Sequence, residues 1–166
     1  LRGKCGEMLG VGVPPGEVNR AQESGLDFGL PYCPGIDVDD PKVGSAGRCD
    51  EFEPPVQLLG PHVVPLGMVF YTGKMFPKDY QQQVFMAEHG SWNRSSPDGY
   101  KVVSLHWTDT GIEERDFVTG FELNGDVIGR PVDVAQGPDG AIYISDDYAG
   151  AIYRVVLEGQ ALPVQQ

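Results

Sequence analysis

The chain is short of positive charge, and this shortage excludes a class of partners. Twelve Lys and Arg residues stand against 24 Asp and Glu, which gives a net charge of −12 over 166 residues. Because no stripe of Lys and Arg is present to neutralise phosphates, nucleic acid is excluded as a partner. The same charge disfavours an anionic membrane surface. A small molecule or a metal ion is the ligand that fits this composition best.

Long apolar runs and helical periodicity are also missing. No run approaches the ~18 residues that a membrane-spanning helix needs, so we expect no membrane insertion. The start lacks the basic-then-apolar pattern of a signal peptide. Since the chain begins at Leu1 and not at Met, we interpret it as a piece cut from a longer protein.

Cysteines are few: three in all, with no metal-binding CxxC pattern. Cys33 and Cys49 flank a loop rich in Gly, Pro and Asp that offers little core of its own. A disulfide across this loop would contribute ~3 kcal/mol through the unfolded state. It would also indicate an oxidising compartment, periplasmic or extracellular. Two free thiols that never meet are equally compatible with the sequence, and Cys5 is left over in either case.

Glycine and proline, by contrast, are abundant at 23 and 14 residues, and they divide the apolar residues into short runs typical of strands joined by turns. The least regular part is 1–60, and one short helix is expected around 77–82. The expected strands cover residues 63–64, 68–71, 83–87, 100–107, 116–121, 131–135, 141–145 and 151–156.

Two Pro-Asp-Gly turns, in 96–99 and in 137–140, each lead into a strand and suggest a repeat. A repeat of about 40–50 residues with four short antiparallel strands is typical of a β-propeller blade; a β-sandwich is the rival. Because closed propellers have about four to eight blades, the chain is too short for a whole one. We predict an all-β partial propeller of about three four-stranded blades: an irregular partial blade in 1–60, a blade in 61–123, and an incomplete last blade in 124–166.

The segment from His89 to Arg94 places an imidazole, an indole, an amide and a guanidinium directly after the apolar run 84–87. At the rim of a sheet, such groups can grip a planar anionic ligand, because Arg offers a bidentate fork and Trp a stacking face. The alternative is a Gly-Ser turn with a structural Trp and a solvated Arg.

Six motifs in order carry a resemblance across nearly the whole chain. They are residues 14–20, 25–33, 61–73, 89–94 with 99–103, 129–134 and 145–154. This series resembles the C-terminal part of the glucose/sorbosone dehydrogenase family, especially its pyranose and sorbosone dehydrogenase branch. The resemblance implies a six-bladed propeller that binds pyrroloquinoline quinone (PQQ) and calcium.

It also implies a function: oxidation of an aldose, pyranose or sorbosone-type sugar by hydride transfer to PQQ, with electrons passed to a cytochrome or quinone acceptor. In the family the general base is a histidine of the N-terminal blades. His89 and His106 do not match it, so we assign no catalytic base and expect the chain alone to be inactive. His106, on a strand, is interpreted as structural, and Asp146 and Asp147 as acceptors for turn amides.

The resemblance implies four cofactor-binding residues: His62, Asn93, Arg94 and Arg130. A planar tricarboxylate needs cations, amide donors and a flat wall, which these residue types supply. Two structural alternatives stay open, since His62 can simply cap a strand and Arg130 can pair with Asp133 on the surface.

For calcium, the resemblance implies Glu17 and the carbonyl of Phe28 as ligands, and hard oxygen atoms suit this ion. Relatives carry an acidic loop just upstream, where this chain has Gly3-Lys4-Cys5-Gly6, and the loss of carboxylates lowers the expected affinity. This departure motivates one alternative, a non-catalytic propeller module for binding or scaffolding. A propeller lactonase, which needs calcium but no quinone, is a third possibility.

Overall fold

The computed structural model describes residues 2–4, 11–44, 49–92 and 94–159. Asn93 and Cys5 lie outside this part of the chain, so the structure carries no statement about them. The strands are β1 (Arg2–Lys4), β2 (Pro15–Asn19), β3 (Gln57–Pro61), β4 (Pro65–Phe70), β5 (Val84–Glu88), β6 (Lys101–Thr108), β7 (Gly111–Val118), β8 (Glu122–Leu123), β9 (Asp126–Val127), β10 (Pro131–Gln136), β11 (Ile142–Asp146) and β12 (Ala151–Val155). Two single turns of 3₁₀ helix, η1 (Cys49–Glu51) and η2 (Lys78–Tyr80), complete the assignment.

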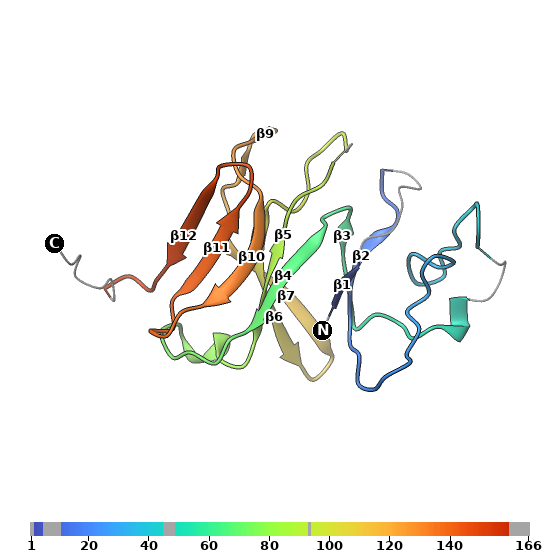
Figure 1. Ribbon diagram of the computed structural model, residues 1–166, viewed down its shortest axis with the longest axis horizontal. Helices are drawn as coiled ribbons and strands as arrows, with labels where there is room; N and C mark the ends of the chain where they lie inside the picture. The colour runs from blue at the N-terminus through green and yellow to red at the C-terminus, as the bar shows by residue number, and fades with distance from the viewer. Residues whose placement is uncertain (1, 5–10, 45–48, 93, 160–166) are drawn as a thin grey trace.

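These strands form three antiparallel sheets that stand side by side like blades (Figure 1). The first holds β1-β2-β3, the middle one β4-β5-β6-β7 and the last β10-β11-β12, each in sequential order, while β8 and β9 make a separate hairpin. The predicted all-β partial propeller is thereby confirmed, with four strands in the middle sheet and three in each neighbour among the described residues. In that part of the chain, no helix combines the length and the hydrophobicity needed to cross a membrane.

The middle sheet is buried on both faces, and its sequence explains how. All five residues of β5 are buried. Because successive side chains of a strand point to opposite faces, Val84 and Met86 join one apolar cluster with the first sheet, and Phe85 and Ala87 join another with the last sheet. A continuous apolar run of strand length is what such a doubly covered strand requires.

The outer strand of the middle sheet begins earlier than its sequence suggests. A weak strand was expected at 116–121, whereas β7 runs from Gly111 to Val118 and pairs with β6 from Thr108 to Val102. The middle of β7 is a run of four charged residues, Glu113 to Asp116. An edge strand tolerates such a run because much of its surface is exposed to water, and the run hides the strand in the sequence. The helix expected around 77–82 is the single 3₁₀ turn η2.

The inner strands of the middle and last sheets approach closely. β10 packs against both β4 and β5. Gly67 of β4 faces Asp133 of β10 so closely that a Cβ at residue 67 would overlap the Asp133 side chain and backbone. Glycine is therefore required at this position, since any side chain would push the two sheets apart.

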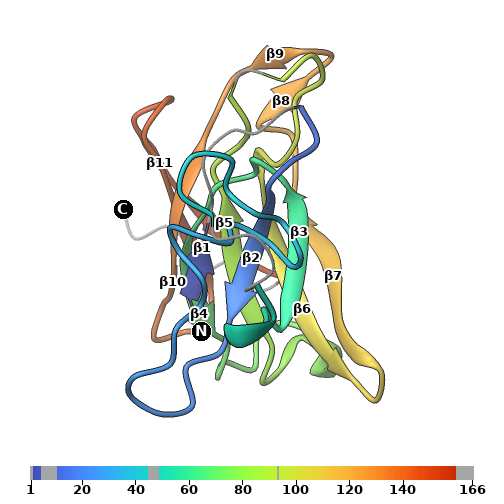
Figure 2. The same ribbon diagram turned by 90° about the vertical axis from the view of Figure 1, so that its right-hand side faces the viewer.

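The long connection between β2 and β3 folds over the outer side of the first sheet (Figure 2). It is held by a disulfide between Cys33 and Cys49, which confirms the bonded alternative over two free thiols. Backbone hydrogen bonds from Cys33 N to Gly29 O (2.7 Å) and from Glu53 N to Asp27 O (2.8 Å) close the loop further. These cross-links order a segment whose described residues, 20–44 and 49–56, contain no regular strand.

Candidate functional site

Three connections meet at one end of the sheets, the upper end in Figure 1: the β3–β4 link, the β5–β6 loop and the β11–β12 turn. Backbone bonds join the first two, since His89 N donates to Val64 O (3.1 Å) and Gly90 N to Val63 O (3.0 Å). His62 is buried and, like Val64, adopts a positive φ. Such a φ is costly for a residue with a side chain, so the link is held in a strained form by its neighbours.

A hollow of about 310 Å³ opens at this rim, between the middle and last sheets. It brings together two of the predicted cofactor-binding residues, Arg94 and Arg130. His62 is not among its lining residues, although the link that carries it borders the same loop. The remaining lining residues are Ser91, Trp92, Pro97, Tyr100, Val127 and Tyr148.

The guanidinium of Arg94 is largely committed to the protein itself. Nη1 donates to the carbonyl oxygens of Val11 (2.9 Å) and Pro61 (3.3 Å), and Nε donates to Ser96 O (3.1 Å). The remaining nitrogen, Nη2, lies 4.0 Å from the Asp98 carboxylate. Arg94 therefore ties the rim loops together and brings positive charge to the wall of the hollow.

Arg130 differs, because its side chain keeps donors for a ligand. Its Nε is buried and has no hydrogen-bond partner among the described residues. The backbone N–H of Arg130 donates to Asp146 Oδ1 (3.0 Å), which fixes the start of β10 against the end of β11. The surface pair with Asp133, the structural alternative for this arginine, is not formed among the described residues. A buried guanidinium nitrogen without an acceptor is the strongest local indication of an anionic ligand.

Asp146 organises the turn that follows it. Its Oδ1 accepts backbone N–H groups of Tyr148 (2.9 Å) and Ala149 (2.8 Å), as well as that of Arg130, and its Oδ2 accepts the Tyr153 hydroxyl (3.1 Å). Burial raises the pKa of Asp146, but these hydrogen bonds outweigh it and the net shift of the pKa is downward. Asp146 thus holds turn amides as expected.

Asp147 does something else, which sequence reasoning missed. Both of its carboxylate oxygens lie 3.1 Å from Nε2 of His89. The two residues come from the β11–β12 turn and the start of the β5–β6 loop, 58 positions apart. The pair joins the middle and last sheets at the rim. His89 directly follows β5 and Asp147 directly follows β11, two strands in neighbouring blades. This similar position within the blade repeat is the one feature of the sequence that could have predicted the contact.

Glu88, at the rim end of β5, is a fully buried carboxyl group. Among the described residues its one oppositely charged partner is Lys101, at 4.0 Å, and neither of its oxygens has a hydrogen-bond partner there. Burial, together with the negative charge of Glu114, raises the pKa of Glu88 to about 8. Lys101 is 2.7 Å from Asp116 and 3.4 Å from Glu114, so at neutral pH it pairs with these two and Glu88 keeps its proton.

His106 fills a structural role, as expected. It is buried, its Nε2 lies 2.8 Å from Ser104 Oγ, and its ring meets Tyr80 edge-on at 5.4 Å. Burial lowers the pKa of His106, which keeps the ring neutral at ordinary pH.

The two residues predicted to bind calcium line the same cavity. Glu17 and Phe28 line one cavity of about 180 Å³ under the β2–β3 loop, together with the acidic residues Asp37, Asp50 and Glu53. Glu17 is buried and accepts a hydrogen bond from Asn19 Nδ2 (3.2 Å). These oxygen donors are of the type that calcium requires. They have not converged, because no three acidic groups of the described residues bring one oxygen each within 4.8 Å. This cavity and the rim hollow share no lining residue.

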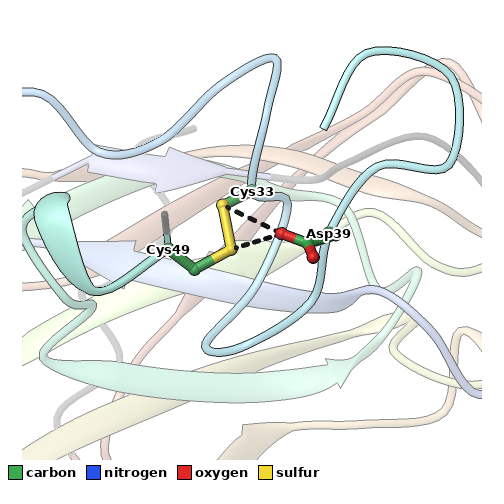
Figure 3. Close-up of side chains that lie close together, drawn as sticks. All are labelled: Cys33, Asp39 and Cys49. Carbon is green, nitrogen blue, oxygen red and sulfur yellow. Dashed lines mark hydrogen bonds between the residues drawn. A yellow bond between two sulfur atoms is a disulfide. The ribbon is translucent and has the colours of Figure 1, made fainter. Parts of the chain in front are cut away.

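One further cluster combines Cys33, Asp39 and Cys49 (Figure 3). The Asp39 Oδ1 lies 3.1 Å from Cys49 Sγ and 3.9 Å from Cys33 Sγ. Because the two sulfurs are bonded to each other, neither is a thiolate, and the cluster has only one group able to bind a metal.

Comparison with known sequences gives a family and two informative relatives. The family model TrAA12-like matches residues 36–158. A functionally uncharacterised protein of Borreliella burgdorferi is 41% identical over 155 residues, which cover 90% of this chain and 41% of the relative. A pyrroloquinoline quinone-dependent pyranose dehydrogenase of Coprinopsis cinerea is 33% identical over 122 residues, which cover 61% of this chain and 16% of the enzyme. The chain spans less than half the length of these relatives.

Solved structures show the same fold. The calcium structure of a Trichoderma reesei enzyme of carbohydrate-active family AA12 superposes with a TM-score of 0.68 at 21% identity, covering 87% of this chain and 43% of that one. The holo form of the PQQ domain of Coprinopsis cinerea pyranose dehydrogenase gives a TM-score of 0.67 at 24% identity, covering 93% and 48%. The resemblance to PQQ-dependent sugar dehydrogenases, first found in the ordered motifs, is confirmed.

Proposed function

The chain belongs to the TrAA12-like family, and on this premise we propose that it is the C-terminal part of a quinoprotein that oxidises a pyranose-type sugar with PQQ. The observation that carries the proposal is the rim hollow, which is lined by Arg94 and Arg130; the buried Nε of Arg130 has no hydrogen-bond partner among the described residues. A planar ligand with three carboxylates matches a hollow with two cations in its wall.

When bound, PQQ supplies a hydride acceptor for the sugar carbon that is oxidised. Arg130 is the residue of this chain that would hold a carboxylate of the cofactor, since its guanidinium retains an unused donor. Arg94 would act mainly by charge and by keeping the rim loops in place, because its own donors serve carbonyl groups. Asn93 and His62 stay proposed contacts of the same cofactor. We assign no general base to this chain, so the proton of the sugar hydroxyl would go to a residue outside it.

Calcium would bind, in this proposal, under the β2–β3 loop. Glu17 and the carbonyl of Phe28 would hold it, with Asp37, Asp50 and Glu53 near enough in the same cavity to close around it. Because this cavity shares no lining residue with the rim hollow, such an ion would stabilise the loop and would not touch the cofactor.

The compartment and the electron acceptor belong to the proposal as well. The Cys33–Cys49 disulfide supports a periplasmic or secreted protein, because such bonds persist in oxidising compartments. The electrons would leave for a cytochrome or a quinone. A propeller lactonase and a non-catalytic module remain the rival functions.

The test uses the complete protein, that is, the whole gene product that contains these residues. PQQ is titrated and binding is followed by calorimetry; sugar oxidation is then followed by dye reduction. We expect Arg130→Ala to weaken PQQ binding by about 10- to 100-fold, the value of one or two charge-assisted hydrogen bonds. Arg20→Ala, at an exposed arginine outside the hollow, is the matched control.

Failure of the folded complete protein to bind PQQ would refute the proposal. Lactone hydrolysis that depends on calcium and not on PQQ would then favour the lactonase. Binding of a ligand without any turnover would favour the non-catalytic module.

A further inference from the structure

The cavity proposed for calcium has walls from three separate stretches of the chain. Glu17 comes from β2, and the other lining residues come from the stretches 28–37 and 49–55 of the β2–β3 connection. Cys33 lies in the first of these two stretches and Cys49 in the second, and both line the cavity. Their disulfide therefore joins two walls of the cavity covalently (Figure 3).

The non-covalent links between the stretches 28–37 and 49–55 are modest. Glu53 N donates to Asp27 O (2.8 Å), just before the first stretch. The ring of Tyr32 stacks on that of Phe52 with centroids 6.4 Å apart, but Tyr32 is 44% exposed. The described residues of the two stretches contain no strands that would pair with each other. The disulfide, which holds the two Cα atoms 5.6 Å apart, is therefore the main restraint on the distance between these walls.

Negative charge gathers where the two stretches meet. Asp37, Asp50 and Glu53 line the cavity, and no lysine or arginine is among the described residues that line it. A neighbouring hollow of about 210 Å³ is lined by Asp37, Asp39, Cys49 and Asp50. Because like charges repel, these carboxylates favour separation of the two stretches when no cation lies between them.

A buried oxygen on the β2 side of the cavity has no partner. Asn19 lies two residues after Glu17 and on the same face of β2, and both side chains are buried. Nδ2 of Asn19 donates to Glu17 Oε2 (3.2 Å), whereas Oδ1 of Asn19 has no hydrogen-bond partner among the described residues. Calcium binds carboxylate and amide oxygens, so the buried side offers ligands of the same kind as the carboxylates of the loop.

We propose that the Cys33–Cys49 disulfide controls calcium binding, so that the oxidised protein binds the ion and the reduced protein releases it. This inference rests on the proposed function, in which calcium binds in this cavity. With the bond intact, Asp37 and Asp50 stay near enough to share one ion. With the bond broken, their repulsion and the freedom of the loop oppose binding. Because such a coupling is reciprocal, bound calcium makes the disulfide harder to reduce by the same factor.

The redox step needs a dithiol as the reductant. The dithiol loses two electrons and two protons and forms its own disulfide, while the bond between Cys33 and Cys49 breaks and each of their sulfurs gains a hydrogen. Calcium leaves with its charge unchanged. The step therefore balances with the dithiol as the one co-reactant.

The experiment uses the complete protein without PQQ. Calcium is titrated by calorimetry into the oxidised protein, into protein reduced with dithiothreitol, and into protein that has been oxidised again. Thermal unfolding of each sample reports whether the sheets stay folded. In a second measurement, the protein is equilibrated with mixtures of reduced and oxidised dithiothreitol, in calcium or in EGTA. Peptide mapping after alkylation then gives the reduced fraction of Cys33 and Cys49.

The variants identify the cavity among any other calcium sites of the complete protein. Asp50→Asn removes a carboxylate of the wall, and its matched control is Glu23→Gln, at an exposed carboxylate of the same connection outside the cavity. The double variant Cys33→Ser, Cys49→Ser represents the open loop without any reductant.

We expect reduction to weaken calcium binding about 10-fold or more, and calcium to shift the reduction equilibrium by the same factor. Oxidation should restore the affinity. Asp50→Asn should weaken calcium binding of the oxidised protein by about 10-fold, because ligand charge sets the affinity of such sites, while Glu23→Gln should resemble the wild type. The double serine variant should bind calcium as weakly as the reduced wild type and should not respond to dithiothreitol.

Equal calcium affinity of the oxidised and reduced proteins overturns the inference and leaves the proposed function intact. So does loss of cooperative unfolding on reduction, since the disulfide would then support the whole fold and not the cavity. If the oxidised protein binds no calcium, the inference and the calcium part of the proposed function fall together. PQQ titration of the same sample still decides the quinoprotein assignment separately.

Discussion

The buried carboxyl group of Glu88 makes the stability of this protein depend on pH in an unusual direction. In the unfolded chain Glu88 loses its proton near pH 4.5, whereas in the folded protein it keeps the proton up to about pH 8. Between these values the folded state binds more protons than the unfolded state. The free energy of unfolding therefore falls as the pH rises through this window.

The magnitude follows from the size of the shift. Each pH unit within the window costs about 1.4 kcal/mol, so raising the pH from 5 to 7 should lower the free energy of unfolding by about 3 kcal/mol through this one group. For a protein of about 150–250 residues that change corresponds to roughly 6–12 °C in melting temperature, and the shift is smaller for a longer chain. Glutamine at this position keeps the shape and cannot ionise, so Glu88→Gln should remove the dependence.

The assay is thermal unfolding of the complete protein between pH 5 and pH 8, with the wild type, Glu88→Gln, and Glu158→Gln at an exposed carboxylate as the control. We expect the melting temperature of the wild type and of the control to decline with rising pH, and that of Glu88→Gln to decline much less. Parallel curves for all three proteins would mean that Glu88 is ionised in the folded state. They would refute the reasoning from burial and would give Lys101 a true ion pair with Glu88.

Three further outcomes are expected from the same complete protein. Gly90→Ala should destabilise it by about 2 kcal/mol or more, measured by denaturant unfolding, because residue 90 has φ +108° and a Cβ there would overlap the ring of Tyr100. Reduction of Cys33–Cys49 should cost about 3 kcal/mol, and proteolysis should then begin within the β2–β3 loop. Asp146→Ala should cost about 2–4 kcal/mol at neutral pH through lost hydrogen bonds. Because the pKa of Asp146 is lowered, this difference from wild type should shrink as the pH falls below 3.8, the ordinary value for the group.

Much of the fold could be predicted from the sequence, for reasons visible at particular residues. The apolar run 84–87 is short, continuous and bounded by turn residues, which is the pattern of a strand buried on both faces, and β5 is such a strand. The Pro-Asp-Gly turns before residues 100 and 141 locate two further strands. The strand β7 was misplaced because its charged residues reflect an edge position, and edge positions are set by the neighbouring sheet.

The site was predictable only in part. The ordered motifs brought Arg94 and Arg130 forward as partners, and they line one hollow; Glu17 and Phe28 likewise share a cavity. What each arginine can do was not readable in the sequence. The guanidinium of Arg94 donates to backbone carbonyl groups, one of them that of Val11, 83 positions away in the sequence. Every residue has a backbone carbonyl, so the residue types do not indicate which of them accepts the hydrogen bond.

By itself, then, the sequence determined the strand pattern, the blade repeat, the family and the residue types available to a ligand, because these depend on local periodicity, turn chemistry and ordered motifs. The tertiary structure alone decided that His89 meets Asp147 across two sheets, that Arg94 and Arg130 line one hollow, and that Glu88 is buried and keeps its proton. These contacts arise from the packing of one blade on the next. Burial and interatomic distances decide which groups of a site are ionised and which hydrogen-bond donors lack an acceptor. Both depend on the fold and cannot be derived from the order of the residues.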